Sequence, residues 1–546
     1  MVLKRIVISL ACMVAFVQAL PARTAPRIVN IVNFIRQTEP RTYTGATDEI
    51  LYETVVEQVK LLSEYGMAGT FLLQYDALIN PLYQDLLRNG VPEGTEIGGW
   101  WEITEPHVEA AGIEWRGRFP WDWYAQVDFS IGYTPEERET LVDVYMEKFK
   151  EIFGYYPKSV GSWFIDAHTL NYMYEKYGIV ASCNCKDQYG TDGYTMWGGY
   201  WNQAYYPSKV NAYMPAQDES AQIPVPVFRM LGSDPIYQYD NALDSHFQKV
   251  VTLEPSCDAG KDEKWINWYL NMIADGECLA FNYLQAGQEN SFMWGRMKEG
   301  LGLQIPLIRR MADAGKLQVM TLAEAGEWFK SQFKTTPATS VTALEDWCDE
   351  GNKSIWYNSR YYRANLFWHK DSFRFRDIHL FDQDMRSAYM DTVVRSNKFV
   401  YSTLPFVDGY VWSTPDHLAG LRPVVLGEDV TAVPVTVAGP ACTARKGKLI
   451  VRCATSAGMM TIKLSEKQMT VRIAAKAAWA LDLTTDKEAV LPFTSVGSKE
   501  LTAVQDGYGY RISLKSGTFS TAGASGVPVR IVPGRNRIRI YLSSTL

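Results

Sequence analysis

The feature that most constrains the fold is a regular alternation of short apolar runs and amphipathic segments from Arg27 to about residue 332. Ile28–Ile35 is a continuous apolar run, and Asp48–Tyr65 then places its apolar residues at helical spacing. The same alternation recurs up to the segments Leu317–Met320 and Ala323–Phe333. Parallel strands require crossover connections, usually helices. The pattern therefore predicts an α/β fold, a parallel β/α barrel of seven or eight strands, over residues 27–334.

The pattern changes after TTPATS (Thr335–Ser340), which reads as a linker. The remaining residues are rich in Thr, Val, Ser and Gly, and apolar and polar residues alternate with a period of two. Val527–Leu542 shows this alternation around a Pro-Gly turn. We therefore expect residues 335–546 to form an antiparallel β-sandwich domain.

Composition and the N-terminus restrict the partners. The net charge of the 546 residues is −7, without a basic block, which argues against nucleic acid and anionic membranes as partners. Lys4 and Arg5 precede an apolar run, Ile6–Val17, and a small-residue site ends at Ala19. This predicts a signal peptide over residues 1–19, a secreted or periplasmic protein, and no integral membrane segment after cleavage.

An acidic residue follows each of five predicted strands. The carboxyl ends of parallel barrel strands share one face, which is the catalytic face of such barrels. Two carboxyl groups on either side of a sugar linkage suffice to hydrolyse it. We expect the catalytic residues among Glu102, Asp166, Asp234 and Glu289, with Asp166 and Asp234 as the leading pair, and Glu39 as a substrate-binding residue.

Each leading acid also has a structural interpretation. Asp166 precedes the helical segment Thr169–Lys176 and is suited to cap it. Asp234 stands before Pro in GSDP, where Asp often forms a turn. The sequence leaves both interpretations open.

Aromatic residues make up 13% of the chain, and many fall in two predicted loops between Trp100 and Tyr206. They either stack on sugar rings in a cleft or fill the core. Arginines and polar residues nearby are suited to bind sugar hydroxyls, an acidic sugar or a structural ion-pair partner. The substrate-binding candidates are Arg36, Trp100, Trp101, Trp115, Arg116, Asp187, Asp192, Trp197 and Gln285, and Arg118 has the same two interpretations as Arg36 and Arg116.

The sequence gives little sign of a metal or cofactor. Only six His residues occur, without an HxH or HxxxH pair, although Asp166, His168 and His107 are conceivable ligands. There is no GxSxG motif and no Gly-rich phosphate loop. We predict no cofactor and no metal. Cys442 and Cys453 are a conceivable disulfide across neighbouring strands.

Several segments resemble the glycoside hydrolase/deacetylase superfamily, which joins NodB-type polysaccharide deacetylases with glycoside hydrolase families 57 and 38. Thr54–Leu73 is similar to the first helix and second strand of the deacetylases, Gly94–Gly99 to a later strand, and Ile273–Leu284 with Gly315–Phe329 to the closing strands. SWFID, ending at Asp166, resembles the nucleophile motif WxPE of family 57. Pro226–Tyr239 resembles the segment that carries that family's acid/base Asp, which places Asp234 in that role.

The chain departs from the deacetylases at their metal ligands. It reads NFIRQTEPR where they carry Asp-Asp, and GWWEITEPH where they carry two His. The whole chain is similar to secreted bacterial proteins that combine this barrel with a β domain. The resemblance implies a secreted hydrolase acting on an oligosaccharide or polysaccharide, and we expect a retaining glycoside hydrolase. The alternatives are a carbohydrate deacetylase with an altered metal site and a non-catalytic glycan-binding protein.

Overall fold

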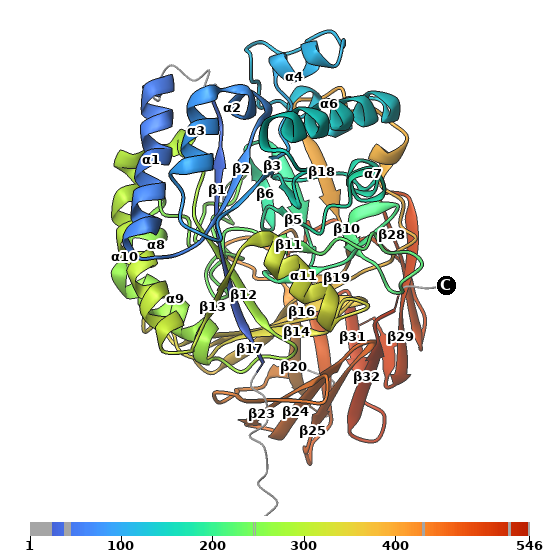
Figure 1. Cartoon of the computed structure of the whole chain (residues 1–546). Coiled ribbons are helices and arrows are strands. Elements are labelled where there is room, and N and C mark those ends of the chain that lie inside the picture. The colour runs from blue at the N-terminus through green and yellow to red at the C-terminus, as the bar shows by residue number, and fades with distance from the viewer. Residues whose placement is uncertain are drawn as a thin grey trace, which may run out of the picture.

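The computed structural model describes residues 25–37, 45–243, 245, 247–427, 432–521 and 526–543. Its N-terminal part is a curled, mostly parallel sheet surrounded by helices (Figure 1). The strands are β1 (Arg27–Ile35), β2 (Thr70–Leu73), β3 (Glu96–Trp100), β4 (Ser159–Gly161), β5 (Ala181–Asn184), β8 (Ala204–Tyr205), β11 (Val227–Arg229), β12 (Asn282–Ala286) and β13 (Gln318–Met320). They pair in the order β12-β1-β2-β3-β4-β5-β11-β8, with β13 beside β1, and β8 runs antiparallel to β11. This confirms the predicted parallel β/α architecture.

The helices surround the sheet, and several begin and end where the sequence supplies caps. They are α1 (Asp48–Glu64), α2 (Tyr75–Ile79), α3 (Pro81–Asn89), α4 (Glu105–Ala110), α5 (Ala125–Asp128), α6 (Pro135–Phe153), α7 (Ala167–Tyr177), α8 (Asp258–Lys261), α9 (Glu263–Asp275), α10 (Trp294–Asp313) and α11 (Leu322–Gln332). Thr134 and Glu137 form a capping box at the start of α6. Gly154 ends that helix at φ 84°, a left-handed conformation that favours glycine.

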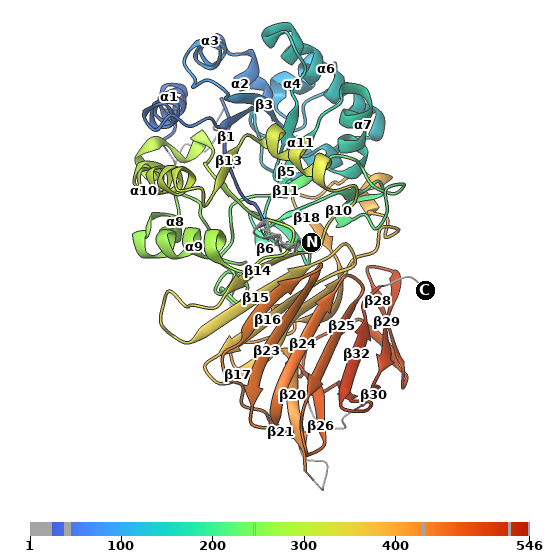
Figure 2. The same ribbon diagram turned by 60° about the horizontal axis from the view of Figure 1, so that its bottom comes forward.

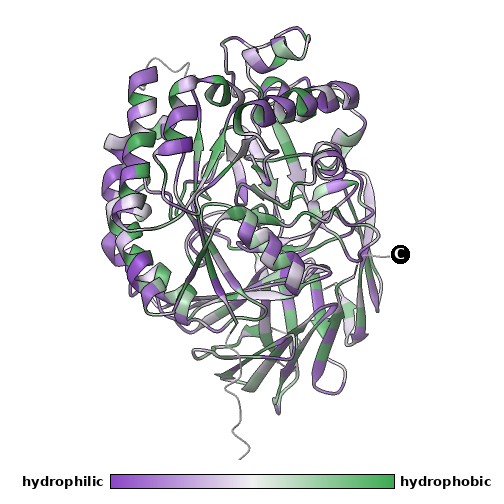
Figure 3. Ribbon diagram, in the orientation of Figure 1, coloured by the Kyte–Doolittle hydropathy of each residue, from purple (hydrophilic) through white to green (hydrophobic). Residues whose placement is uncertain are grey.

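The core of this part lies on both faces of the sheet. In β1 every residue after Arg27 is buried, as expected for a parallel strand covered on both sides. The outer helices carry purple and green stretches along their length in Figure 3, because each has one face on the sheet and one in solvent.

Short strands are inserted between β5 and β11, and two antiparallel sheets follow α11. The inserted strands are β6 (Gln188–Thr191), β7 (Tyr194–Trp197), β9 (Pro207–Ser208) and β10 (Asn211–Pro215). One large sheet contains β14 (Thr339–Ala343), β15 (Asn352–Asn358), β16 (Tyr362–His369), β17 (Ser372–Leu380), β19 (Leu404–Asp408), β20 (Gly420–Leu426), β21 (Ala432–Pro434), β26 (Trp479–Thr484), β30 (Thr518–Ser520) and β31 (Val529–Val532). The other contains β22 (Ala441–Arg445), β23 (Lys448–Thr455), β24 (Gly458–Ser465), β25 (Gln468–Ile473), β27 (Phe493–Val496), β28 (Glu500–Gln505), β29 (Tyr508–Ser516) and β32 (Arg537–Tyr541).

These sheets form the sandwich-like C-terminal part, below the helices in Figure 2. Buried and less buried residues alternate along β23, β24 and β25, which confirms the period-two prediction. The disulfide considered between Cys442 and Cys453 is not formed. Cys442 lies opposite Val451 and Cys453 opposite Met460, and both thiols are free.

The two parts are joined by more than the segment between α11 and β14. Strand β18 (Phe399–Ser402), from the C-terminal part, pairs in parallel with β7 of the barrel insertion. The Trp201 amide donates a hydrogen bond to Oδ1 of Asn358 on β15 at 2.9 Å. None of the helices in the described part of the chain has the length and apolar character needed to cross a membrane. The predicted signal peptide lies outside the described residues.

Candidate functional site

Polar side chains from four neighbouring strands meet at the carboxyl ends of the sheet. Arg36 follows β1, Gln74 follows β2, Glu102 comes two residues after β3, and Glu289 follows β12. Since β12, β1, β2 and β3 are adjacent in the sheet, their ends place these residues together. With Asp128, described below, we call them the strand-end cluster.

Arg36 is the centre of this cluster. Its guanidinium binds both oxygens of Glu102, with Nε 2.7 Å from Oε2 and Nη2 in contact with Oε1. Its Nη1 lies 2.6 Å from Oε1 of Glu289. Gln74 donates to Oε2 of Glu102 at 3.0 Å. A planar guanidinium is suited to such two-point binding, so Arg36 holds two carboxylates in fixed positions.

Asp128 joins the cluster from the loop side. Its carbonyl accepts a hydrogen bond from the Ile103 amide at 2.9 Å, which ties α5 to the residue after Glu102. Its carboxyl Oδ1 accepts from the indole of Trp121 at 2.9 Å. The Trp121 ring in turn lies against Arg36, whose Cζ is 4.4 Å from the ring centre.

The electrostatics separate Asp128 from its neighbours. Burial, followed by the charge of Glu102, raises the pKa of the Asp128 carboxyl well above its ordinary value, against the opposing effects of Arg36 and Trp121. Asp128 is therefore suited to carry a proton. Glu102 and Glu289 both pair with the Arg36 guanidinium. A proton-bearing acid beside carboxylates held by a cation is an arrangement suited to acid-assisted bond cleavage.

Aromatic side chains surround the cluster. Trp163, just past β4, packs edge-on against Trp100 with ring centres 5.9 Å apart and is partly exposed. Tyr194 on β7 hydrogen-bonds the carbonyl of Trp123, and the charges of Asp128 and Glu102 contribute to its raised pKa after burial. Tyr194 is covered by Phe399, which stacks on it at 4.8 Å, so Trp163 is the partly exposed ring in this region.

Among the described residues, no group of three or more His, Cys, Asp or Glu side chains is placed to hold a metal ion. His107 is buried against Tyr75, at a ring distance of 4.6 Å, and its Nε2 is 2.9 Å from the carbonyl of Leu141. It therefore belongs to the core.

The expectation that Asp166 shares this cluster is not met. Asp166 is the N-cap residue of α7, and its Oδ1 accepts from the Thr169 amide at 3.1 Å. Oδ2 accepts from the hydroxyls of Thr169 and Ser130, each at 2.6 Å, and Arg138 donates to Oδ1 at 3.2 Å. With both oxygens occupied, the structure gives this carboxylate the capping role that the sequence also allowed.

Asp234 is likewise used locally. It is fully buried, and Oδ1 accepts from the amides of Ile236 and Tyr237 at 2.7 and 2.9 Å. Oδ2 accepts from the indole of Trp265 at 2.8 Å. This is the turn-forming interpretation. The described contacts of Asp166 and Asp234 have no residue in common, so the geometry does not support them as a catalytic pair.

Replacing Asp166 by Asn is expected to lower thermal stability while leaving catalysis near the wild-type rate. Asn caps helices as well as Asp does, but it loses the charge facing buried Arg138, a change of about 1.5–3 kcal/mol. Thermal unfolding and turnover on the same preparation would measure this. Loss of turnover in a variant with an unchanged melting temperature would restore Asp166 as a catalytic residue.

The predicted substrate-binding aromatics are divided between core and loop. Trp100 is fully buried and stacks on Phe34 at 3.8 Å, and Trp101 is buried against His107 and Tyr145. Both fill the core, so their assignment to substrate is corrected.

The loop before α5 contains the other candidates of that region. Trp115 is partly buried and donates to the carbonyl of Phe119 at 3.0 Å. Arg116 is exposed, stacks on Tyr133 and donates to Gly132. Arg118 pairs with Asp122 at 2.7 Å, the structural alternative weighed for it.

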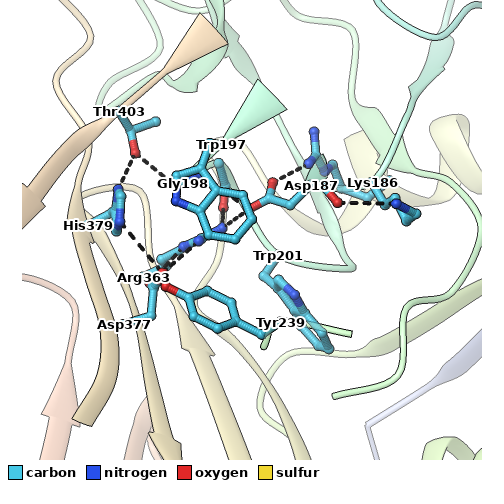
Figure 4. Close-up of polar contacts among 12 residues, drawn as sticks. Lys186, Asp187, Trp197, Gly198, Trp201, Tyr239, Arg363, Asp377, His379 and Thr403 are labelled. Carbon is cyan, nitrogen blue, oxygen red and sulfur yellow. Dashed lines mark hydrogen bonds and ion pairs between the residues drawn. The ribbon is translucent and has the colours of Figure 1, made fainter. Parts of the chain in front are cut away.

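Asp187 and Trp197 lie in a buried network between the barrel and the large sheet (Figure 4). Asp187 binds Arg229 at 2.6 Å and also contacts Arg363 of β16. The Trp197 indole donates to Asp408 at 2.8 Å. The assignment of both to substrate is corrected, because the C-terminal part covers them.

Three candidates remain. Asp192 is exposed in the β6–β7 turn with φ 54°. Gln285 is buried on β12 beside Asn30 of β1. Glu39 lies outside the described residues.

The sequence reasoning missed Asp128, Trp121 and Gln74. Gln74 directly follows β2 and could have been found by the strand-end rule applied to amides. Asp128 and Trp121 follow no strand. Their loop reaches the cluster through the residues that follow β3, where the Ile103 amide bonds the Asp128 carbonyl.

Comparisons agree with this fold. Residues 132–262 match the family model of a domain of unknown function with a solved structure, DUF3863. The comparison with curated proteins gives no match. A solved structure from Parabacteroides distasonis, described as a glycoside hydrolase/deacetylase, is similar with a TM-score of 0.52 and 16% identity, over 70% of this chain and 90% of that one.

Two further structures show weaker similarity. A protein from Mycobacterium smegmatis, described as a polysaccharide deacetylase, gives a TM-score of 0.36 and 14% identity over 58% of this chain and 95% of that one. The 4-alpha-glucanotransferase of Thermococcus litoralis gives 0.32 and 11% over 95% and 100%. The similarity to the Parabacteroides distasonis structure shows that the chain shares the fold of that protein.

Proposed function

We propose that this chain is a carbohydrate-active hydrolase that cleaves glycosidic bonds at the strand-end cluster. The observation that supports the proposal is a buried acid with a raised pKa, Asp128, beside two carboxylates held by one arginine. Glycosidases divide the same two tasks between a protonated and an ionised carboxyl group.

The contacts suggest a role for each group. Asp128 protonates the leaving glycosidic oxygen. Glu289 serves as the ionised carboxylate that attacks the anomeric carbon or activates water. Glu102, with both oxygens on Arg36 and one also on Gln74, positions Arg36 and helps keep Asp128 protonated. Retention of the anomeric configuration remains a prediction. It is tested by determining the anomer of the product that is released first.

Substrate binding follows from the surroundings. The partly exposed Trp163 ring offers an apolar face for a sugar, as aromatic side chains do in ligand sites. Secretion through the N-terminal segment remains part of the proposal, and its test is whether the mature protein begins after Ala19.

The proposal is tested by incubating the protein with a panel of plant and host glycans while measuring released reducing ends and released acetate. We expect new reducing ends from at least one glycan. Glu289→Gln should abolish them, whereas Glu299→Gln, an exposed substitution on α10, should not.

The other outcomes distinguish the alternatives. Release of acetate without reducing ends would identify a deacetylase. Binding without either product would identify a glycan-binding protein, and equal activity in the Glu289→Gln and Glu299→Gln variants would remove Glu289 from the mechanism.

A further inference from the structure

A cavity lies where the loop after β11 meets the large sheet, far along the chain from the strand-end residues. Its volume is about 650 Å³, within the range of about 300–1,000 Å³ typical of ligand sites. Aromatic side chains (Tyr237, Trp347 and Phe367) and two arginines (Arg374 and Arg422) line it, together with Asp240. None of these residues belongs to the strand-end cluster.

Positive charge exceeds negative charge at one end of this cavity. Arg374 and Arg376 both bind the same oxygen of Asp240, Oδ2, at 2.6 and 3.1 Å. Arg422 lies near them, but its described hydrogen bonds go to neutral groups, the Thr484 hydroxyl and the Leu418 carbonyl. Three guanidinium groups therefore face one carboxylate.

The cost of this arrangement is visible at Arg422. Burial, then the charge of Arg374, lowers its pKa to about 10 despite the attraction of Asp240. An anion placed among these groups would relieve that repulsion. The carboxylates of Asp346 and Glu350 do not neutralise these arginines. They accept hydrogen bonds from the Tyr237 hydroxyl, at 2.7 and 3.2 Å.

The cavity also has the features that recognise a sugar ring. Oδ1 of Asp240 is buried and has no hydrogen-bond partner among the described residues. A buried acceptor without a partner is unfavourable, and a ligand hydroxyl would satisfy it. Trp347 and Phe367 offer flat apolar surfaces.

We propose that this cavity, which we call the arginine pocket, binds a hexuronate unit of an acidic glycan, with the sugar carboxylate on Arg374 and Arg422 and a ring hydroxyl on Asp240. Guanidinium groups match the planar geometry of a carboxylate. The pocket would anchor a polymer on the C-terminal part, whichever bond the strand-end cluster cleaves.

The test is calorimetric titration of the full chain with trigalacturonic acid, with maltotriose as the neutral probe and a sulfated disaccharide as the other anion. We expect trigalacturonic acid to bind at least tenfold more tightly than maltotriose, and more weakly as salt is raised. Arg422→Gln should weaken that binding at least tenfold. Arg452→Gln, which removes an exposed arginine from β23, should leave it unchanged.

Three results would overturn the proposal. The first is that trigalacturonic acid does not bind. The second is that Arg422→Gln and Arg452→Gln weaken its binding equally. The third is that the sulfated disaccharide binds more tightly than trigalacturonic acid. Repeating the titration with the Glu289→Gln variant separates the two sites, because uronate binding at the arginine pocket should survive a substitution that abolishes turnover. If Arg422→Gln melts more than a few degrees below wild type, Trp347→Leu tests the aromatic wall and should weaken binding instead.

Discussion

Replacing Asp128 by Asn is expected to slow glycoside cleavage by about 10²–10⁴-fold, the usual contribution of a positioned general acid. Asn keeps the size of the side chain and can still accept the Trp121 hydrogen bond, so the loop should stay in place. It cannot deliver a proton to the leaving oxygen. The rate constant on a glycan identified by the panel measures the effect.

The leaving group and the pH provide sharper evidence than the rate alone. Aryl glycosides with acidic leaving groups need little protonation, so the variant should lose much less activity on them. In the wild type, activity should fall as the pH rises through the raised pKa of Asp128, because the acid is then deprotonated. The Asp128→Asn variant should lack this alkaline limb.

Asp85→Asn is the matched control, since Asp85 is exposed on α3 and contacts Asn89 of the same helix. It should leave the rate and the pH profile unchanged. If Asp128→Asn slows natural and activated substrates equally, Asp128 acts by positioning other groups and is not the proton donor.

The sequence predicted the frame of this site because strand ends in a parallel sheet share one edge. Arg36, Glu102 and Glu289 follow apolar runs, and the sheet order brings them into contact. The helix bounds could also be read from caps, as at Thr134 and Gly154. Local chemistry thus indicated the elements and three of the five residues of the cluster.

The same rule did not separate catalytic acids from structural ones. Asp166 and Asp234 also follow apolar runs, but nearby amides and hydroxyls occupy their oxygens. An Asp after a strand satisfies the requirements of a cap, a turn and a catalytic group alike. Only the hydrogen-bond donors that surround each Asp in the folded protein decide which of these three roles it has.

Long-range packing explains the remaining differences. Asp187 resembles a substrate-binding residue in a polar, aromatic loop, yet its partner Arg363 is 176 residues away in the chain. Asp128 enters the site through a backbone hydrogen bond to Ile103 that no local pattern indicates. Contacts of this kind depend on the docking of whole elements and leave little trace in a single sequence.

The largest effect on stability is expected from Arg363, which joins the barrel to the large sheet. Its side chain is fully buried, and its Nε and Nη2 bind both oxygens of Asp377 at 2.8 and 2.7 Å. Its Nη1 contacts Asp187 and donates to the carbonyl of Gly199 at 2.9 Å. One guanidinium therefore bridges a carboxylate from each part of the chain (Figure 4).

Removing this cation would leave an excess of buried negative charge. Asp187, Asp377 and Asp408 would then face Arg229 and His379, whose Nε2 lies 3.4 Å from Asp408 and 3.6 Å from Asp377. Burial would raise the pKa of Asp408, but its bonds to His379 and Trp197 lower it, so this carboxylate is ionised in the folded protein. Because its pKa is depressed, its contribution to stability is present above its unfolded pKa and is lost as the pH falls through the folded one.

Arg363→Met is therefore expected to destabilise the protein by about 3–5 kcal/mol, as when one partner of a buried ion pair is removed. Arg360→Met is the control, because Arg360 stands three residues before Arg363 but forms a more exposed ion pair, with Glu466. Such a pair contributes about 0–1 kcal/mol. Thermal unfolding midpoints and limited proteolysis of the segment between α11 and β14 measure the difference. If both variants melt together with the wild type, the barrel and the large sheet are held by their apolar contacts and by β18 on β7, and the buried network contributes no net stability.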